Sequence, residues 1–214
     1  MKSDKEIFEQ IYEEKAVWTE TEPPLELLNL INSGKIAPCR VLDSGCGAGF
    51  YSIYMAKKGF DVTGIDISEN AIRTAKENAI KHKVKIEFIP MDISDLDKLK
   101  VKFDFIFEWA LLHHIAPEKR KKYIIKLRSI LNSGGKYLSV CFNNQNSDFG
   151  LKGKKLRTVP EGGRMPAGTR LYYSSFTEIN NLFKPHFKTI EARLIKMTAG
   201  NKVHIGNYYL TEKR

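Results

Sequence analysis

A glycine-rich segment early in the chain constrains the fold most. Residues 41–49 read VLDSGCGAG, an apolar run followed by Gly45, Gly47 and Gly49. A helical segment comes next, and a second apolar run then ends at Asp66. A turn of this kind joins a strand to a helix and brings backbone N–H groups and the helix N-terminus close to a ligand. The segment therefore predicts a βαβ unit with a ligand at its turn.

The alternation of strand and helix continues along the chain. Short apolar runs rich in β-branched and aromatic residues are separated by helical or loop segments, and they read RVLD, FDVTGID, KIEFIPMD, FDFIFE and GKYLSVCF. We expect helices over 51–58, 68–81 and 117–131, the last of them ended by Gly134 and Gly135. This order predicts the α/β class, with a doubly wound and mostly parallel sheet.

Both ends of the chain add further elements. Two capping boxes, Ser3 with Glu6 and Ser175 with Glu178, predict one helix near the N-terminus and another before the last strands. Two strand-like runs, KTIEARLIKM and KVHIGNYYL, predict an antiparallel hairpin at the sheet edge. The Gly-, Asn- and Lys-rich stretch 143–173 is too long for an ordinary connection, and it predicts a lid over the site or a partly disordered segment.

Composition limits the remaining classes. No window approaches the roughly 18 uninterrupted apolar residues that cross a bilayer, and the N-terminus lacks the pattern of a secretory signal, so we expect a cytoplasmic protein. The three cysteines have no CxxC spacing, which favours reduced thiols and no metal site. The net charge is +10, but much of the excess lies in PEKRKKYIIKLRS, whose apolar residues recur at helical spacing. A solvated helix face is therefore favoured over a nucleic-acid patch.

The glycine turn departs from the dinucleotide pattern. A pyrophosphate site reads G-x-G-x-x-G, whereas the third glycine of GCGAGF arrives one residue early. Asp43 would also repel a pyrophosphate, but it suits a ligand with an ammonium or sulfonium charge, such as S-adenosylmethionine. In this interpretation Asp66 accepts hydrogen bonds from the ribose hydroxyls and Asp92 accepts one from the adenine amine. Apolar surface for the adenine ring would come from Ile67, Met91 and Ile93.

Several motifs then carry a resemblance to a known family. VLDSGCGAG, GIDIS, MDI, FDFIFEWALLHHI and LNSGGKYLSVCF, within residues 37–142, resemble the motifs of class I S-adenosylmethionine-dependent methyltransferases. The resemblance implies a seven-stranded, Rossmann-like sheet with one reversed strand near its edge and the cofactor at the carboxyl ends of the first strands. It implies cofactor contacts from Gly45, Cys46, Gly47, Gly49 and Glu108. It also places beside the reaction pocket two candidate general bases, His113 and His114.

The N-terminal stretch narrows the resemblance. YEEKAVWTETEPPLELLNLI, the PEKR segment and FTEINNLFKPHFKTI resemble the small-molecule branch, which includes thiopurine, thiol or halide, and tellurite-resistance methyltransferases. In that branch the aromatic residue corresponding to Trp18 helps to cover the cofactor. Trp109 stands where the thiopurine enzymes carry arginine, so we expect an apolar or aromatic substrate wall. The sequence EWAL also lacks the Asn/Asp-Pro-Pro-aromatic motif of adenine-methylating sites.

A single domain in four parts is the expected organisation, because 214 residues, 42% of them hydrophobic, suit one core. The parts are an N-terminal helical cap (1–36), a cofactor-binding core (37–142), a long basic Gly-rich loop or lid (143–173) and a C-terminal helix with a β-hairpin (174–214). We expect transfer of a methyl group to a small molecule. The acceptor atom, whether sulfur, oxygen, nitrogen, halide or metalloid, and the oligomeric state stay open.

Other interpretations compete with these roles. Asp66 and Asp92 are also suited to cap helices, Cys46 to fill the core, and either histidine to hold its loop against the sheet. An RNA methyltransferase acting on tRNA is a second function, with phosphates bound by Lys152, Lys154, Lys155, Arg157, Arg164 and Arg170 and bases stacked on Tyr172 and Tyr173. A third is a binding module that senses the cofactor without catalysis.

Overall fold

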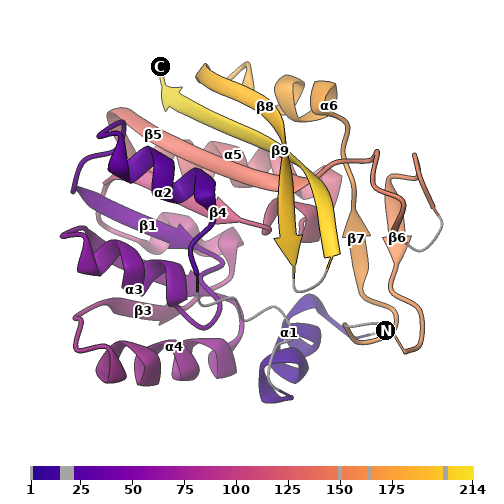
Figure 1. Cartoon of the computed structure of the whole chain (residues 1–214), viewed down its shortest axis with the longest axis horizontal. Coiled ribbons are helices and arrows are strands. Elements are labelled where there is room, and N and C mark those ends of the chain that lie inside the picture. Colours follow the sequence, from indigo (N-terminus) through magenta and orange to yellow (C-terminus); the bar gives the residue numbers. More distant parts are fainter. Residues whose placement is uncertain (1, 15–21, 149–150, 163–164, 200–201) are drawn as a thin grey trace.

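The structure is a computed structural model, and it describes residues 2–14, 22–148, 151–162, 165–199 and 202–214 (Figure 1). The helices are α1 (Asp4–Glu13), α2 (Leu25–Asn32), α3 (Phe50–Lys57), α4 (Glu69–Lys81), α5 (Pro117–Ile130) and α6 (Phe176–Phe183), with short 3₁₀ segments η1 (Ile93–Lys98) and η2 (Leu112–His114). The strands are β1 (Arg40–Ser44), β2 (Asp61–Asp66), β3 (Glu87–Pro90), β4 (Phe103–Trp109), β5 (Leu131–Phe142), β6 (Leu156–Thr158), β7 (Arg170–Tyr172), β8 (Phe187–Ala199) and β9 (Lys202–Lys213).

A seven-stranded sheet organises the molecule, in the order β3-β2-β1-β4-β5-β9-β8. The pairings among β1 to β5 are parallel, whereas β9 runs antiparallel to both of its neighbours. The expected α/β fold, with a mostly parallel sheet and one reversed strand near the edge, is confirmed. The expected terminal hairpin is confirmed as well, because β8 and β9 pair along almost their whole length.

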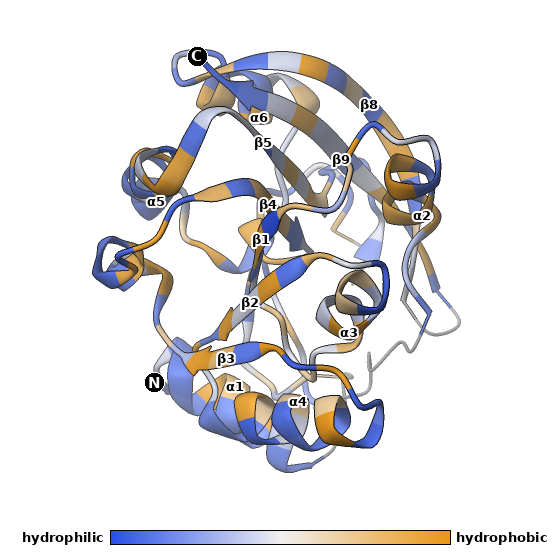
Figure 2. Ribbon diagram, turned by 90° about the vertical axis from the view of Figure 1, so that its left-hand side faces the viewer, coloured by the Kyte–Doolittle hydropathy of each residue, from blue (hydrophilic) through white to orange (hydrophobic). Residues whose placement is uncertain are grey.

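Helices cover both faces of the sheet. Figure 2 shows α5 on one side of the strands and α2 and α3 on the other. One buried cluster joins the sheet to Leu127 of α5 and Phe183 of α6, and a second joins it to Leu27 of α2 and Met55 of α3. Strands buried on both faces need continuous apolar sequence, which explains why runs such as FDFIF lack a strict alternation of polar and apolar residues.

The local signals are accurate in most places. Both capping boxes form, with the Ser3 hydroxyl accepting from Glu6 N–H and the Ser175 hydroxyl accepting from Glu178 N–H. One expectation is wrong. Gly134 and Gly135 do not end α5, because the helix stops at Ile130 and both glycines lie in β5, where the register against β4 shifts.

The long basic segment is partly ordered by pairing with itself. Its strands β6 and β7 form a separate antiparallel pair, from Leu156 opposite Tyr172 to Thr158 opposite Arg170. In Figure 1 this pair lies beside the main sheet, at the same end of the molecule as α1. The carboxyl ends of β1, β2 and β4 lie side by side, since Asp43 is opposite both Gly64 and Phe107. Among the described residues, none of the helices has both the length and the apolar composition to span a membrane.

Candidate functional site

A cavity of about 770 Å³ lies at the carboxyl ends of the parallel strands. Its wall is built from α1, the turn after β1, the segments after β2, β3 and β4, the β6–β7 region and the beginning of β9. Open α/β sheets bind their ligands in a crevice at this edge, between two neighbouring strands whose following connections run to opposite faces of the sheet. The cavity is therefore the candidate site, and its two ends differ in chemistry.

The turn after β1 is fixed by bonds to the end of β2. The N–H groups of Gly45 and Cys46 both donate to the carbonyl of Ile65, at 2.8 and 2.9 Å. The N–H of Gly47 donates to the carboxylate of Asp66 at 3.0 Å. These bonds bring the glycine turn and the predicted ribose-binding carboxylate together at one end of the cavity.

Two of the glycines are required by close contacts as well as by their backbone conformation. Gly47 has a φ of +52°, and a Cβ atom there would lie 2.3 Å from the hydroxyl of Tyr12 in α1. Gly49 has a φ of +79° and is the N-cap of α3, and its Cβ would lie 2.8 Å from Phe88 and 3.0 Å from Ala75. Gly49 does not line the cavity; it sets the path of the turn into the helix.

Two acids face the cavity beside this turn, Asp43 buried and Asp66 partly buried. Asp43 accepts a hydrogen bond from the Ser52 hydroxyl at 2.6 Å, yet burial raises its pKa to about 7. Burial also raises the pKa of Asp66 to about 6, although the N–H groups of Ser68 and Gly47 oppose this shift. A ligand with positive charge would favour the ionised form of both acids.

The third predicted acid, Asp92, lies at the outer edge of the same end. It is exposed, lines the cavity, and accepts the N–H of Ser94 at 2.7 Å as the N-cap of η1. Its capping function is therefore present, and a carboxylate retains further lone pairs for a ligand. The wall around it contains the other predicted residues Cys46, Ile67, Met91 and Ile93.

Helix α1 closes this end of the cavity through an arrangement that the sequence did not predict. The carboxylate of Glu9 accepts from the Ser68 hydroxyl at 2.9 Å and from the N–H groups of Glu69 and Asn70 at 2.7 and 3.0 Å. An acid from one helix thus caps the N-terminus of another, where the helix dipole favours negative charge. Burial raises the pKa of Glu9, but these donors outweigh it and hold the pKa below its usual value.

A row of five rings runs from α1 to β9 along the cavity wall. Phe8 meets His114 edge to face at 5.0 Å between ring centres, and His114 lies 4.5 Å from His113. His113 stacks on Phe142 at 3.9 Å, and Phe142 stacks on His204 at 4.7 Å. All five residues line the cavity. The row gives the second end of the cavity an aromatic wall suited to a flat ligand.

Trp109 packs against the same buried cluster as Phe142 of the ring row. It ends β4 and lines the cavity together with Leu111. Between them, Ala110 has a φ of +65°, and its N–H donates to the Val140 carbonyl at 2.8 Å. A positive φ is uncommon for alanine, so the chain turns sharply at the point where β4 leaves the sheet for the cavity wall.

The two candidate bases reach the cavity, but their environments argue against that role. His113 Nδ1 lies 3.3 Å from the backbone N–H of Phe142, which can only donate, so the ring proton is on Nε2 and that atom is a donor. Burial lowers the pKa of His113 far below its usual value and lowers that of His114 to about 4. Groups with such low affinity for protons are poor bases at neutral pH.

Glu108 is not among the residues that line the cavity. Its carboxyl group is buried behind the wall, where it accepts from the hydroxyls of Ser139 and Tyr123. Burial raises its pKa to about 7, although these hydroxyls lower it. The predicted contact between Glu108 and the cofactor is therefore not supported by its position. Trp18, the remaining predicted residue, lies outside the described residues.

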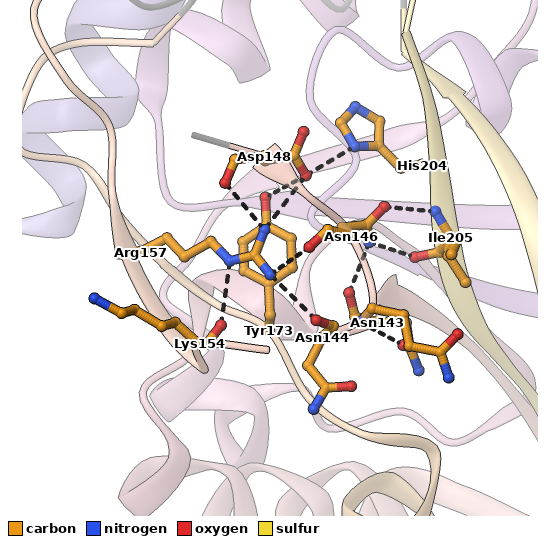
Figure 3. A network of polar contacts seen from close by, with 10 residues as sticks. Asn143, Asn144, Asn146, Asp148, Lys154, Arg157, Tyr173, His204 and Ile205 are labelled. Carbon is orange, nitrogen blue, oxygen red and sulfur yellow. Dashed lines mark hydrogen bonds and ion pairs between the residues drawn. The ribbon is translucent and has the colours of Figure 1, made fainter. Parts of the chain in front are cut away.

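The long basic segment contains a buried arginine at its centre. Arg157 is 1% exposed and donates to the backbone carbonyls of Asn144, Asn146, Asp148 and Lys154 (Figure 3). Its guanidinium group lies 3.7 Å from the ring centre of Tyr173. Arg157, one of the six basic residues proposed for RNA, is therefore unavailable to phosphates. Over the described ranges, no group of three His, Cys, Asp or Glu side chains is arranged to hold a metal ion.

Comparison with known proteins decides the family. A family model for a methyltransferase domain matches residues 41–135. An uncharacterized methyltransferase of Schizosaccharomyces pombe is 32% identical over 119 residues, which cover 56% of this chain and 81% of that protein. The chain belongs to the class I S-adenosylmethionine-dependent methyltransferases.

Two further similarities bear on this methyltransferase. A ubiquinone biosynthesis O-methyltransferase of Coxiella burnetii is 37% identical over 109 residues, which cover 51% of this chain and 44% of that protein. A solved structure of 1,6-didemethyltoxoflavin-N1-methyltransferase from Burkholderia thailandensis aligns with 98% of this chain and 86% of its own, with a TM-score of 0.76 and 20% identity. The family match ends at residue 135, before the β6–β7 region and β9.

The glycine-turn end fits the cofactor of this family. Three carboxyl groups, those of Asp43, Asp66 and Asp92, line it, and residues 43–51 contain no lysine or arginine. Carboxylates would be repelled by phosphates, whereas a sulfonium or ammonium group offsets their charge. The residues present therefore suit S-adenosylmethionine better than a dinucleotide.

Proposed function

We propose that this methyltransferase transfers a methyl group to a small, flat acceptor bound against the row of rings. The single observation that carries the proposal is that one cavity contains both the acidic glycine-turn end and the aromatic end. A volume of about 770 Å³ is within the usual range for drug-sized ligands. A cofactor and a small acceptor therefore have room to lie side by side.

The cofactor is assigned to the end next to the glycine turn. Asp66 would accept hydrogen bonds from the ribose, Asp92 from the adenine amine, and Asp43 would face the positive charge. The apolar side chains of Ile67, Met91 and Ile93 would contact the ring. When bound, S-adenosylmethionine supplies a methyl group that is electrophilic because it is attached to a sulfonium. The protein then has to hold the acceptor in line with that methyl group and to exclude water.

The acceptor is assigned to the end between Trp109 and β9. Its walls combine the ring row with Trp109 and Tyr173, and the β6–β7 region adds Val159, Met165 and Leu171. Met165 also packs with the buried Ile7 and Ile11 of α1, so the two covering elements meet over the cavity. Such a cover favours a small molecule over a nucleic-acid strand. The names of the two similar enzymes, which act in ubiquinone biosynthesis and on didemethyltoxoflavin, support an aromatic or heterocyclic acceptor.

The first test is a calorimetric titration with S-adenosylhomocysteine, run beside NAD. We expect the homocysteine compound to bind and NAD not to bind. Methyl transfer is then followed by mass spectrometry with phenols, N–H heterocycles, thiols, iodide and bulk tRNA as acceptors. Transfer to a small acceptor supports the proposal. Transfer to tRNA alone would replace it by the RNA function, and binding without any transfer would favour a cofactor sensor.

A further inference from the structure

A histidine and a carboxylate meet at the aromatic end of the cavity. Nδ1 of His204, near the start of β9, lies 3.2 Å from a carboxylate oxygen of Asp148, and both residues line the cavity. Figure 3 shows Asp148 between His204 and Arg157. A carboxylate can only accept, so Nδ1 of His204 carries the ring proton and donates it to this bond. In the neutral form of the ring, the lone pair is then on Nε2.

Asp148 is held in its charged form. Its carboxylate also accepts from the Tyr173 hydroxyl at 3.0 Å, and the Arg157 guanidinium lies 3.9 Å away. Burial raises the pKa of Asp148, but His204, Tyr173 and Arg157 outweigh it and hold the pKa below its usual value. A charged partner at Nδ1 fixes the orientation of the imidazole and stabilises it once Nε2 takes a proton.

Nε2 of His204 is available to a ligand. Within the described part of the chain no protein group forms a hydrogen bond with this atom, and the side chain is 11% exposed, on the cavity wall. In the ring row Phe142 lies between the two histidines, stacked on His113 on one side and on His204 on the other. The two histidines are thus complementary: His113 offers an N–H donor, and His204 offers a lone pair.

Anchoring of β9 does not account for the His204–Asp148 bond. The segment before Asp148 is already joined to β9 by Asn146, whose side chain accepts from Ile205 N–H at 2.7 Å and donates to the Ile205 carbonyl at 2.8 Å. Asn143 donates to the side chain of Asn207 at 2.7 Å. Three contacts therefore hold the strand without the histidine.

Given the proposed function, on which this step rests, we infer that the acceptor carries its nucleophile as an O–H or N–H group and that His204, held by Asp148, takes that proton. The acceptor atom gains a bond to the methyl carbon, the bond from that carbon to sulfur breaks with its electron pair left on sulfur, and the acceptor's proton moves to Nε2 of His204. The proton then leaves to water. A thiolate or a halide would need no such base.

The tautomer is tested first, without any turnover. In protein labelled with ¹⁵N-histidine, long-range nitrogen–proton spectra show which ring nitrogen carries the proton. We expect Nδ1–H for His204 and Nε2–H for His113. Asp148→Asn should switch His204 to Nε2–H, because the amide can donate to Nδ1. His204→Asn assigns the signals, and the exposed His82, at the end of α4, serves as a control in His82→Asn. A resting Nε2–H form of His204 would overturn the inference.

The acceptor class is tested with phenols of graded acidity, from 4-nitrophenol, which is largely ionised at mildly alkaline pH, to 4-methylphenol, which is not. His204→Asn should lower kcat/KM for 4-methylphenol about 100-fold, which lies within the usual contribution of a general base. The loss for 4-nitrophenol should be small. Asp148→Asn should likewise lower kcat/KM far more for 4-methylphenol than for 4-nitrophenol, whereas His82→Asn should leave kcat/KM unchanged for both phenols.

The remaining outcomes separate this inference from the proposed function. Suppose that S-adenosylhomocysteine binds, but that His204→Asn lowers kcat/KM equally for both phenols, or that only thiols or iodide accept the methyl group. His204 is then not a general base, and the assignment as a methyltransferase stands. If S-adenosylhomocysteine does not bind to the wild-type protein, the proposed function itself fails. Thermal unfolding and S-adenosylhomocysteine affinity equal to those of wild type show that the variants are folded.

Discussion

The two ends of the cavity are built by different means. The cofactor end takes its acids and glycines from positions 43–92, where successive parallel strands finish at one edge of the sheet. The acceptor end combines α1, the segment after β4, the β6–β7 region and β9, which together extend along the chain from Asp4 to Lys213. Backbone geometry at the strand ends forms most of the cofactor end, which α1 then closes, whereas side-chain packing between distant segments forms the acceptor end.

The chemistry of the two ends differs in the same way. The cofactor end has carboxyl groups whose pKa values are raised by burial and which a cation would ionise. The acceptor end has the row of rings and a carboxylate, Asp148, that donors keep charged. We therefore expect a positively charged ligand group at one end, and at the other a neutral group that loses a proton. Substitutions at each end should affect different measurements.

The largest expected effect is on folding and comes from the glycine turn. Gly49→Ala should lower the free energy of unfolding by about 2–4 kcal/mol, because a positive φ is strained for alanine and the new Cβ crowds Phe88 and Ala75. At the acceptor end, Gly162 also has a positive φ, but nothing lies within 4 Å of its Cβ position. Gly162→Ala should therefore cost only about 1–2 kcal/mol. Urea unfolding measures the loss of stability in both variants, and equal losses would contradict the proposed difference between the two ends.

The second effect is on cofactor affinity. Asp66→Asn should weaken binding of S-adenosylhomocysteine by about 1–3 kcal/mol, through loss of charge-assisted hydrogen bonds to the ribose. Asp61→Asn is the matched control, because Asp61 lies exposed at the other end of the same strand and pairs with Arg40. Calorimetry compares the two variants. Unchanged affinity in Asp66→Asn would remove Asp66 from the ribose site.

The difference between the two ends also explains what the sequence could predict. Gly45, Asp43 and Asp66 occur in a short segment whose periodicity marks strand, turn and helix, so strand order alone brings them together. Their contacts follow from the parallel register, in which Asp43 lies opposite Gly64. The glycine turn and the neighbouring acids of the cofactor end could therefore be predicted from about thirty residues of sequence.

The acceptor end could not be read in this way. His204 occurs in KVHIGNYYL, where it resembles any polar residue of a strand, and Asp148 occurs in a segment that resembles a disordered loop. Only the tertiary fold brings the two together, and only hydrogen bonding distinguishes His113 as a donor from His204 as an acceptor. The resemblance to the family placed His113 and His114 beside the reaction pocket, but such a resemblance carries no information about which ring nitrogen is protonated.

The third prediction concerns pH at the cofactor end. In the free protein Asp43 has a pKa of about 7, so below that pH it is mostly protonated and neutral. A bound cation favours the ionised form, which lowers this pKa in the complex, so affinity for S-adenosylmethionine should increase as the pH rises from about 6 and level off above about 7.

The affinity for S-adenosylmethionine should increase by up to about tenfold for each pH unit, for each proton that binding releases. Calorimetry from pH 5.5 to 8 measures this gain. The same measurements with Asp43→Asn correct for protonation of the ligand's own groups over this pH range. The variant should show a flatter profile, with a remaining slope around pH 6 from Asp66, whose pKa is about 6. Parallel profiles for the two proteins would contradict a contact between Asp43 and the charged part of the cofactor.

The smallest effect should be confined to the acceptor end. Tyr173→Phe removes one of the hydrogen bonds that hold Asp148 in position, while the Tyr173 ring still packs against Arg157. We expect kcat/KM for a protonated acceptor to decrease about three- to tenfold, the usual value of a single hydrogen bond, and S-adenosylhomocysteine affinity to stay the same. Tyr54→Phe, on α3, is the control. A decrease in cofactor affinity without a decrease in transfer would mean that Tyr173 acts through the packing of the whole cavity, and the two ends would then be a single unit.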